Sequence, residues 1–285
     1  MAGGAMMITR FAPSPTGLLH LGHAFSALTA FDLARARGGR FLLRIEDIDR
    51  PRCRPEFEQA IFEDLAWLGL DWPEPVMRQS ARGAAYEAAL ARLAQMGLVY
   101  PCSCTRADIR AALSAPQEGA AGPGPDGPVY PGTCRGRSME TRRPGDAVRL
   151  DMARAMALAG PLTFDEDGPR HRGRHRRSPA QMVSEVGDVV LARKDIGTSY
   201  HIAVVVDDAA QQISHVVRGE DLFEATAIHV LLQRLLDLPT PVYHHHRLIR
   251  DANGKRLAKR DDARAIRAFR AEGLSPEDVR ALVGL

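Results

Sequence analysis

Apolar and polar positions alternate along the first hundred residues in the manner of helices packed against buried strands. Residues 41–45 form a short, mostly apolar run, which predicts a buried strand. Helices are predicted over residues 24–36 and 54–68, and a third is expected to begin with Ser80 as its cap and to stop at Gly97. This alternation predicts an α/β fold with a Rossmann-like, doubly wound parallel sheet.

The pattern changes after the first hundred residues. Residues 101–195 contain three of the four cysteines, a stretch rich in Ala, Gly and Pro over 114–128, and a basic run. They predict an inserted α+β subdomain. Strands are expected to return at 202–206 and 213–217, followed by a helix over 225–236, which would resume the interrupted sheet.

These changes divide the chain into four predicted parts. Residues 1–100 and 196–246 are the two halves of the Rossmann-like domain, and residues 101–195 are the insertion between them. Residues 247–285 hold a lysine-bearing loop and a short helical stem, whose last helix opens with Ser275 as the cap and a proline next to it.

The overall composition says little about function, and the one informative feature is a run of basic residues. The chain has 285 residues, of which 45% are apolar and 26% are charged, as expected of a globular protein, and a net charge of +3 does not indicate nucleic acid. Residues 170–177 contain five arginines, and this run either binds phosphates or is a solvated loop. Because no run of 18 apolar residues and no signal peptide is present, we expect a cytoplasmic protein without membrane contact. We also expect a monomer.

Two segments suggest phosphate binding. Residues 13–23 form a Gly- and Pro-bearing loop that leads into a helix, with His20 and His23 on one face of the helix N-terminus, where an anion is favoured. Gly22 lacks a Cβ and lets a flat ring approach the backbone. Residues 255–260 contain four cations that could clamp phosphates. Both segments have alternatives without function. The first could be a generic turn that contains Gly and His, and the second could be a solvated basic loop.

Other candidates come directly after predicted strands or at their entry. Glu46 could accept an ammonium group, and Arg218 suits a carboxylate because its guanidinium is planar and always charged. Tyr200 offers a hydroxyl group and a flat face. Residues 244–246 are three histidines, but without a carboxylate or cysteine at helical spacing they are interpreted as a loop rather than a metal site.

The cysteines favour metal or free thiols over disulfides, because no secretory signal is present. Cys102 and Cys104 are one residue apart, and Tyr130 and Cys134 follow later in the chain. Three thiolates and one further ligand can hold zinc, and plain thiols are the alternative. Cys53 lies far from this group and is interpreted as a plain thiol.

The order of these motifs resembles that of the class I aminoacyl-tRNA synthetases of the glutamyl branch, over nearly all of the chain. Residues 20–23 correspond to the family's "HIGH" motif and residues 256–260 to its "KMSKS" motif. Only 25 residues follow Arg260, whereas glutamyl-tRNA synthetases carry a large helical anticodon-binding region there. Together with the Cys and Tyr set, this resembles the short glutamyl-Q tRNA(Asp) synthetase family.

The resemblance implies that glutamate is activated with ATP and magnesium without tRNA, and is then transferred to the queuosine base in the anticodon of tRNA(Asp). The residues that it implies for glutamate binding are Arg10, Phe11, Ala12, Pro13, Ser14, Glu46, Tyr200 and Arg218. Those that it implies for ATP are His20, Gly22, His23, Arg256 and Lys259, with His20, His23 and Lys259 catalytic. It also implies zinc on Cys102, Cys104, Tyr130 and Cys134.

The lysine motif departs from the family pattern, since Arg256 replaces its first lysine and Ala258 replaces its serine. We expect looser closure over ATP rather than loss of activity. Two alternatives remain at this point. The chain could be a truncated glutamyl-tRNA synthetase that charges a tRNA 3′ end, or a non-catalytic, zinc-bearing tRNA-binding paralogue.

Overall fold

The computed structural model describes residues 6–114, 123–250 and 264–285. The lysine motif, with the predicted ATP residues Arg256 and Lys259, lies outside the described residues.

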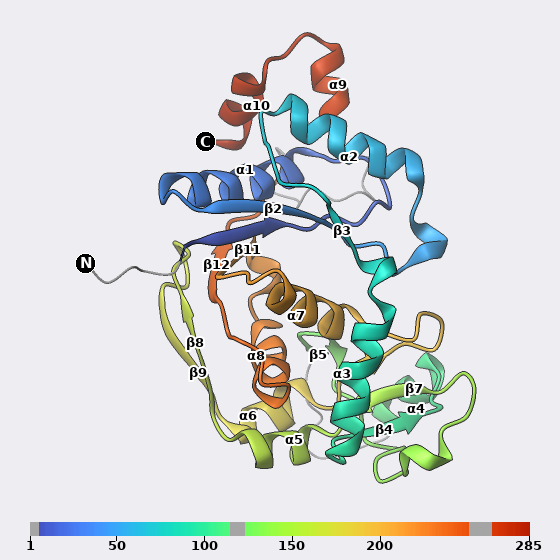
Figure 1. Cartoon of the computed structure of the whole chain (residues 1–285). Coiled ribbons are helices and arrows are strands. Elements are labelled where there is room, and N and C mark those ends of the chain that lie inside the picture. The colour runs from blue at the N-terminus through green and yellow to red at the C-terminus, as the bar shows by residue number, and fades with distance from the viewer. Residues whose placement is uncertain (1–5, 115–122, 251–263) are drawn as a thin grey trace.

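A parallel sheet forms the centre of the fold (Figure 1). Strand β1 (Ile8–Phe11) pairs with β2 (Arg40–Ile45), and β2 pairs with β3 (Met77–Arg78), all in parallel. Strands β11 (His215–Gly219) and β12 (Val242–His246) also run parallel to each other. The two groups meet at β1 and β11, where the backbone N–H of residue 214 donates to the carbonyl of residue 8 at 3.0 Å. The predicted parallel sheet is confirmed.

Helices cover both faces of this sheet (Figure 1). Helices α1 (Leu21–Ala36) and α2 (Pro55–Trp67) lie on one face, and α3 (Gly83–Gln95), α7 (Tyr200–Ala210) and α8 (Thr226–Leu235) lie toward the other. Each face has its own cluster of buried apolar side chains. The layering is therefore doubly wound, as the sequence predicts.

The prediction of a strand at residues 202–206 is wrong, because these residues lie inside helix α7. The run Ile202–Val205 is buried throughout, and so are Asp207 and Asp208 further along the helix. A helix that is buried almost all round has no polar stripe, so its apolar run cannot be told from that of a buried strand by periodicity.

The cap expected at Ser80 is also wrong. Helix α3 begins at Gly83, Arg82 is its N-cap residue, and no side chain makes the capping hydrogen bond. Ser80 instead lies in a short 3-10 turn, where its backbone N–H donates to Asp47 Oδ1 at 2.7 Å. Gly97 follows the helix with a φ of +68°, a left-handed conformation that explains the glycine.

Within residues 101–195 the chain builds a second, antiparallel sheet and then returns to the first. Strand β7 (Ala147–Leu150) pairs with both β4 (Val99–Cys102) and β10 (Val190–Ala192). The other elements of this part are α4 (Arg106–Ser114), β5 (Pro123–Gly124), β6 (Gly127–Pro128), α5 (Met152–Ala159) and α6 (Pro179–Gln181).

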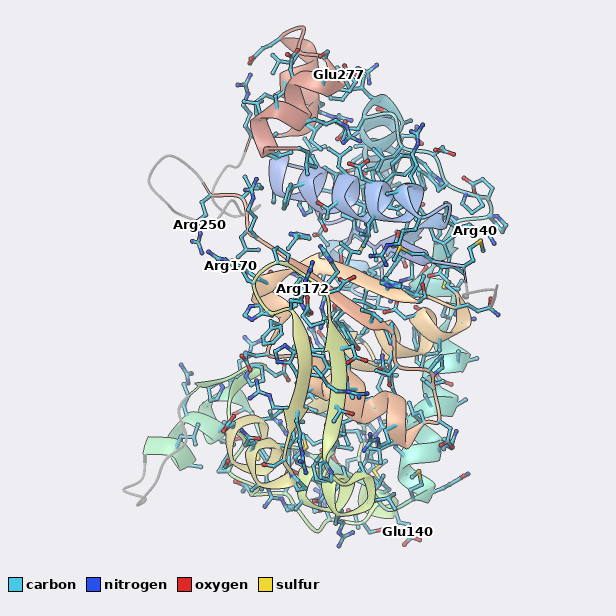
Figure 2. All side chains as sticks on the ribbon, turned by 90° about the vertical axis from the view of Figure 1, so that its left-hand side faces the viewer. Arg40, Glu140, Arg170, Arg172, Arg250 and Glu277 are labelled. Carbon is cyan, nitrogen blue, oxygen red and sulfur yellow. The ribbon has the colours of Figure 1, made fainter. Side chains whose placement is uncertain are left out.

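A long hairpin made of β8 (Leu162–Glu166) and β9 (Gly173–Arg177) joins the central sheet, since β8 pairs with β12. Part of the basic run is therefore a strand and not a loop. Figure 2 shows Arg170 and Arg172 at one end of this hairpin. Arg170 is paired with Glu220 at 2.9 Å.

Of the C-terminal helices, α10 (Pro276–Val283) packs against α1, whereas α9 (Ile266–Ala271) reaches α2, where Arg267 pairs with Glu63 at 3.4 Å. Ser275 caps α10 by accepting from the backbone N–H of Asp278, which confirms the prediction. Arg280 fixes α10 to α1 through two hydrogen bonds to Asp32, of 2.7 and 2.9 Å. No helix in the described ranges is both long and apolar enough to cross a membrane.

Candidate active site

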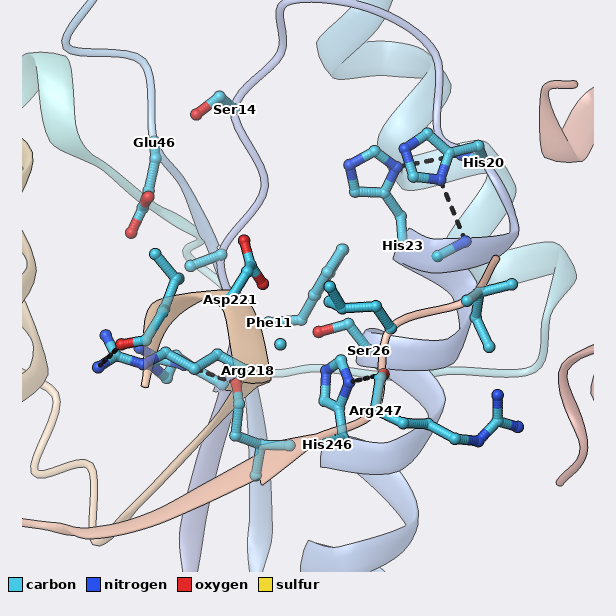
Figure 3. A pocket seen from close by; sticks show the side chains of 18 of the residues that line it. Phe11, Ser14, His20, His23, Ser26, Glu46, Arg218, Asp221, His246 and Arg247 are labelled. Carbon is cyan, nitrogen blue, oxygen red and sulfur yellow. Dashed lines mark hydrogen bonds between the residues drawn. The ribbon is translucent and has the colours of Figure 1, made fainter. Parts of the chain in front are cut away.

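A pocket of about 660 Å³ opens at the carboxyl ends of four parallel strands (Figure 3). Residues at or just after the ends of β1, β2, β11 and β12 line it, which is where ligands bind in open α/β sheets. The predicted residues that it brings together are Arg10, Phe11, Ala12, Ser14, His20, Gly22, His23, Glu46, Tyr200 and Arg218. Pro13 does not line the pocket; its carbonyl accepts from the backbone N–H of Glu46 at 3.0 Å.

Several lining residues were missed by the sequence reading. They are Ser26, Val217, Gly219, Asp221, Leu222, His246, Arg247, Leu248 and Ile249. The segment 246–249 was missed because residues 244–246 were interpreted as a loop, whereas they end strand β12. If residues 242–246 had been recognised as a strand parallel to β11, the residues that follow them would have been expected at the same edge of the sheet.

His20 and His23 form one end of the pocket (Figure 3). His20 is the N-cap of α1, and its Nδ1 accepts from the backbone N–H of Gly22 at 3.1 Å. His23 Nδ1 accepts from the backbone N–H of His20 at 3.1 Å, and the two rings are 3.8 Å apart. Because both Nδ1 atoms accept, the proton of each neutral ring is on Nε2, which is then a hydrogen-bond donor.

Gly22 is required by this capping arrangement. A Cβ at position 22 would lie 3.0 Å from Cε1 and 3.1 Å from Nδ1 of His20. The flat ring that approaches the backbone here is therefore His20 itself. A side chain at this position would push the imidazole away from the helix N-terminus.

At the other end of the pocket, four charged groups form a buried network. Asp208 Oδ1 accepts from Arg10 Nε at 3.0 Å and from Arg44 Nη1 at 2.8 Å. Arg44 is fully buried and also pairs with Glu46 at 3.1 Å. Asp208 was not among the predicted residues, because residues 202–206 were assigned to a strand that would have ended before it.

Burial and charge compete in this network. Burial alone would raise the pKa of Asp208, but Arg10 and Arg44 outweigh it, and the pKa of this carboxyl is lowered. Burial also raises the pKa of Glu46, and there Arg44 and Arg10 only partly compensate. A cationic ligand beside Glu46 would favour its charged form.

Most of the Arg218 guanidinium is held by the protein. Its Nε donates to His245 at 3.0 Å, its Nη1 to His229 at 3.0 Å, and its Nη2 to Thr226 Oγ1 and to the carbonyl of Leu222, at 2.8 and 3.2 Å. A guanidinium has five N–H groups, so one on Nη1 remains for a ligand. The residue type suggests bidentate pairing with a carboxylate, but this geometry leaves a single donor and a fixed positive charge.

His245 links Arg218 to a buried carboxylate. Its Nε2 accepts from Arg218, so Nδ1 carries the proton and donates to Glu166 Oε2 at 2.6 Å. The histidine run at 244–246 is thus part of a strand, and its central ring serves as a hydrogen-bond relay between β11 and β8.

A second relay runs from Arg218 toward the insertion. His229 Nδ1 accepts from Arg218, which places the ring proton on Nε2, 3.1 Å from His201 Nδ1. His201 then carries its proton on Nε2, 3.3 Å from the carboxylate of Asp126. Two chains of oriented imidazoles therefore connect one guanidinium with two carboxylates.

These buried histidines predict loss of stability in mild acid. Burial and the charge of Arg218 lower the pKa of His245 to about 4, despite its bond to Glu166, and burial and Arg218 lower that of His229 well below its ordinary value. The unfolded chain therefore binds more protons below pH 6.5. His245 alone should lower the free energy of unfolding by about 2 kcal/mol between pH 8 and pH 5.

Denaturant titration at pH 8, 7, 6 and 5 measures this effect. His245→Asn should flatten the curve, while a stability that stays constant from pH 7 to pH 5 would contradict the prediction.

The cysteines form a second cluster, within the insertion. The Sγ atoms of Cys102, Cys104 and Cys134 all lie within 4.8 Å of one another. The hydroxyl of Tyr130 is 3.4 Å from Cys102 Sγ and 3.3 Å from Cys104 Sγ. Ligands of a tetrahedral zinc lie roughly 3.5 Å apart, given metal–ligand distances of about 2.0–2.3 Å, so these four groups fit the ion. Arg149 Nε donates to Cys102 Sγ at 3.4 Å.

Comparisons with known proteins agree with this architecture. The family model described as "tRNA synthetases class I (E and Q), catalytic domain" matches residues 6–285. The chain is 62% identical over 284 residues to the glutamyl-Q tRNA(Asp) synthetase of Rhodobacter capsulatus, covering 98% of this chain and 100% of that protein. It is 42% identical over 293 residues to the protein of the same name from Symbiobacterium thermophilum, covering 96% and 84%.

A solved structure shows the same fold. The crystal structure of a glutamate tRNA ligase from Elizabethkingia meningosepticum, in complex with its amino acid, matches with a TM-score of 0.76 and 28% sequence identity. The match covers 98% of this chain but 60% of the ligase, so the chain spans less than two thirds of that protein. From the family model and the relatives together, the chain belongs to the glutamyl-Q tRNA(Asp) synthetases, a family of ligases within the class I tRNA synthetases.

Proposed function

We propose that this chain activates L-glutamate with ATP, without tRNA, and transfers the glutamyl group to the queuosine base in the anticodon of tRNA(Asp). The observation that carries the proposal is a single pocket with two imidazole donors at one end and Glu46, Arg10 and Arg218 at the other. The first end suits phosphates, and the second suits an amino acid that bears two carboxylates and one ammonium group.

In this proposal Glu46 holds the α-ammonium group of glutamate, because its carboxylate lines the pocket away from His20 and His23; Asp221 is a second carboxylate in the lining (Figure 3). Arg218 presents its remaining N–H and its charge to a carboxylate. Arg10 uses three of its five N–H groups on Asp208 and Val217 and keeps two for the substrate. Phe11, Ala12, Ser14 and Tyr200 complete the walls.

Activation requires positioning and charge stabilisation rather than covalent help from the protein. A glutamate carboxylate oxygen attacks the α-phosphorus of ATP, the bond to the bridging oxygen breaks, and pyrophosphate leaves. The Nε2–H groups of His20 and His23 would donate to phosphate oxygens as charge moves onto them. We propose that Lys259 and Arg256 bind the remaining phosphates, and that ATP enters as its magnesium complex.

We also propose that Cys102, Cys104, Tyr130 and Cys134 hold one zinc ion in a structural role. Four protein ligands would leave no open position on a tetrahedral metal, which is typical of structural sites. The ion would join β4 to the segment that follows β6 and so order the insertion.

Glutamate-dependent ATP–pyrophosphate exchange without tRNA tests activation. Exchange is expected, and its absence at every glutamate concentration would contradict the proposal. Transfer of radiolabelled glutamate to tRNA(Asp) with and without queuosine then tests the acceptor. Transfer that ignores queuosine, with the product discharged like a 3′ ester, would favour a synthetase that charges 3′ ends.

Glu46→Gln should raise the KM for glutamate in the exchange reaction by about 10- to 150-fold. The variant keeps the shape of the side chain but loses a charge-assisted hydrogen bond of roughly 1.5–3 kcal/mol to the ammonium group. Asp47→Asn is the matched control, because Asp47 binds the backbone of Ser80 and does not line the pocket. A glutamate KM equal to that of the wild type would show that the ammonium group binds elsewhere.

A further inference from the structure

Arg218 divides one of its terminal nitrogens between the protein and the pocket. Its Nε is used by His245, and its Nη2 by Thr226 Oγ1 and the carbonyl of Leu222. Its Nη1 donates one N–H to His229 Nδ1 at 3.0 Å, and the other N–H of Nη1 is the one that remains for a ligand. The residue that holds Nη1 therefore acts directly on the donor that serves the pocket.

His229 contacts two residues of the pocket without lining it. It lies in helix α8 and is 1% exposed. Besides its hydrogen bond to Arg218, its ring meets the ring of Tyr200 edge to face, with 5.6 Å between the centroids. Arg218 and Tyr200 both line the pocket, and His229 does not. A change at His229 would reach a bound ligand through these neighbours.

The contact with Arg218 requires one tautomer of His229. An arginine N–H can only donate, so Nδ1 of the imidazole must be unprotonated and Nε2 must carry the proton. The other tautomer would set two donors against each other and leave a buried N–H of Arg218 without an acceptor, which is costly. Burial and the charge of Arg218 lower the pKa of His229 well below its ordinary value, so the ring is neutral and has a single proton to place.

The surroundings of the second ring nitrogen fit the same tautomer. His229 Nε2 lies 3.1 Å from His201 Nδ1, and His201 Nε2 lies 3.3 Å from Asp126 Oδ1. A carboxylate only accepts, so His201 carries its proton on Nε2 and offers Nδ1 as an acceptor to His229. Each nitrogen of His229 is thus matched by a neighbour of the opposite hydrogen-bonding character.

We propose that His229 is a positioning residue for glutamate activation. It holds Nη1 of Arg218 so that the remaining N–H is presented to a substrate carboxylate, and it touches no reacting atom itself. The inference rests on the proposed function, because it takes Arg218 to bind glutamate. Without the acceptor on His229, the guanidinium would turn toward other acceptors to satisfy the buried N–H, and the donor that serves the pocket would be displaced.

Two amide substitutions separate this role from packing. The amide group of asparagine reaches the place of the histidine Nδ1, and that of glutamine reaches the place of Nε2. His229→Asn should therefore keep the bond to Arg218 and lose the bond to His201, and His229→Gln should do the reverse. In exchange without tRNA, we expect the KM for glutamate to stay within about threefold of wild type in His229→Asn and to rise at least about tenfold in His229→Gln. The KM for ATP and the maximal exchange rate should stay close to their wild-type values.

His244→Asn is the matched control, because His244 binds Asp167 and does not line the pocket. It should keep the wild-type KM for glutamate. A residue that served packing alone would give His229→Asn and His229→Gln the same glutamate KM, and that result would overturn the proposal. Wild-type protein without exchange would instead contradict the proposed function.

A second measurement does not depend on whether a variant folds. The ring ¹⁵N resonances of His229 in the wild-type protein report where its proton lies. We expect a proton on Nε2 and none on Nδ1 at about pH 7, with or without glutamate. A proton on Nδ1 would overturn the proposal, because that nitrogen could then not hold Arg218, and it would do so whatever the outcome of the exchange reaction.

Discussion

Arg218→Ala is expected to abolish glutamate-dependent exchange at ordinary glutamate concentrations. The variant removes both the positive charge and the remaining Nη1 N–H that would face a substrate carboxylate. Loss of a buried, charged partner costs roughly 2–5 kcal/mol, so kcat/KM for glutamate should fall by about 30- to 5,000-fold. Steady-state exchange over a wide range of glutamate concentrations measures it.

The same substitution leaves two histidines and a threonine without their donor, so a folding defect must be separated from a binding defect. Arg218→Lys keeps the charge but cannot replace four fixed hydrogen bonds. We expect it to fold, as judged by its thermal melting, and to show a raised glutamate KM. Arg234→Ala is the control for loss of a structural arginine, because the Arg234 guanidinium donates to the carbonyls of residues 159 and 161 and does not line the pocket. An unaltered glutamate KM in Arg218→Lys and Arg218→Ala would place the carboxylate site elsewhere.

Removal of zinc is expected to produce the second large effect. The purified protein should contain about one equivalent of zinc, measured by elemental analysis. Cys134→Ser, or treatment with a chelator, should release the metal and unfold the insertion, because structural zinc contributes on the order of 10 kcal/mol to small domains. Resistance to limited proteolysis should be lost within residues 101–195 first.

Cys53→Ser is the matched control, since the other three cysteines form the cluster and Cys53 lies outside it. It should retain both zinc and stability. Metal analysis that finds no zinc in the wild type, or a Cys134→Ser variant that melts like the wild type, would contradict the four-ligand site.

Much of the site could be predicted because strand order brings distant motifs together. Glu46 follows β2 and Arg218 lies at the carboxyl end of β11, so both had to lie at one sheet edge once those parallel strands were recognised. The capping histidines could be placed because a Gly-bearing loop led into a clear helix. In these cases the local pattern and the global fold point to the same answer.

The errors at residues 202–206 and 244–246 have a common physical origin. Residues 202–206 and 244–246 are surrounded by protein on nearly every side, so neither run shows the periodicity that separates helix, strand and loop. The partners of Arg218 could not be predicted for a different reason. Which N–H of a guanidinium remains for a ligand depends on side chains from β12 and α8, and only packing decides that.

The two imidazole relays have a consequence for communication within the molecule. Glu166 and Asp126 both belong to the segment between the two halves of the central sheet, and both are connected to Arg218 through histidines. A ligand that holds Arg218 in place stabilises these connections, and thermodynamic linkage requires the reverse to be equally true. If Arg218 binds the amino acid as proposed, affinity for it should depend on the integrity of a segment most of which does not line the pocket.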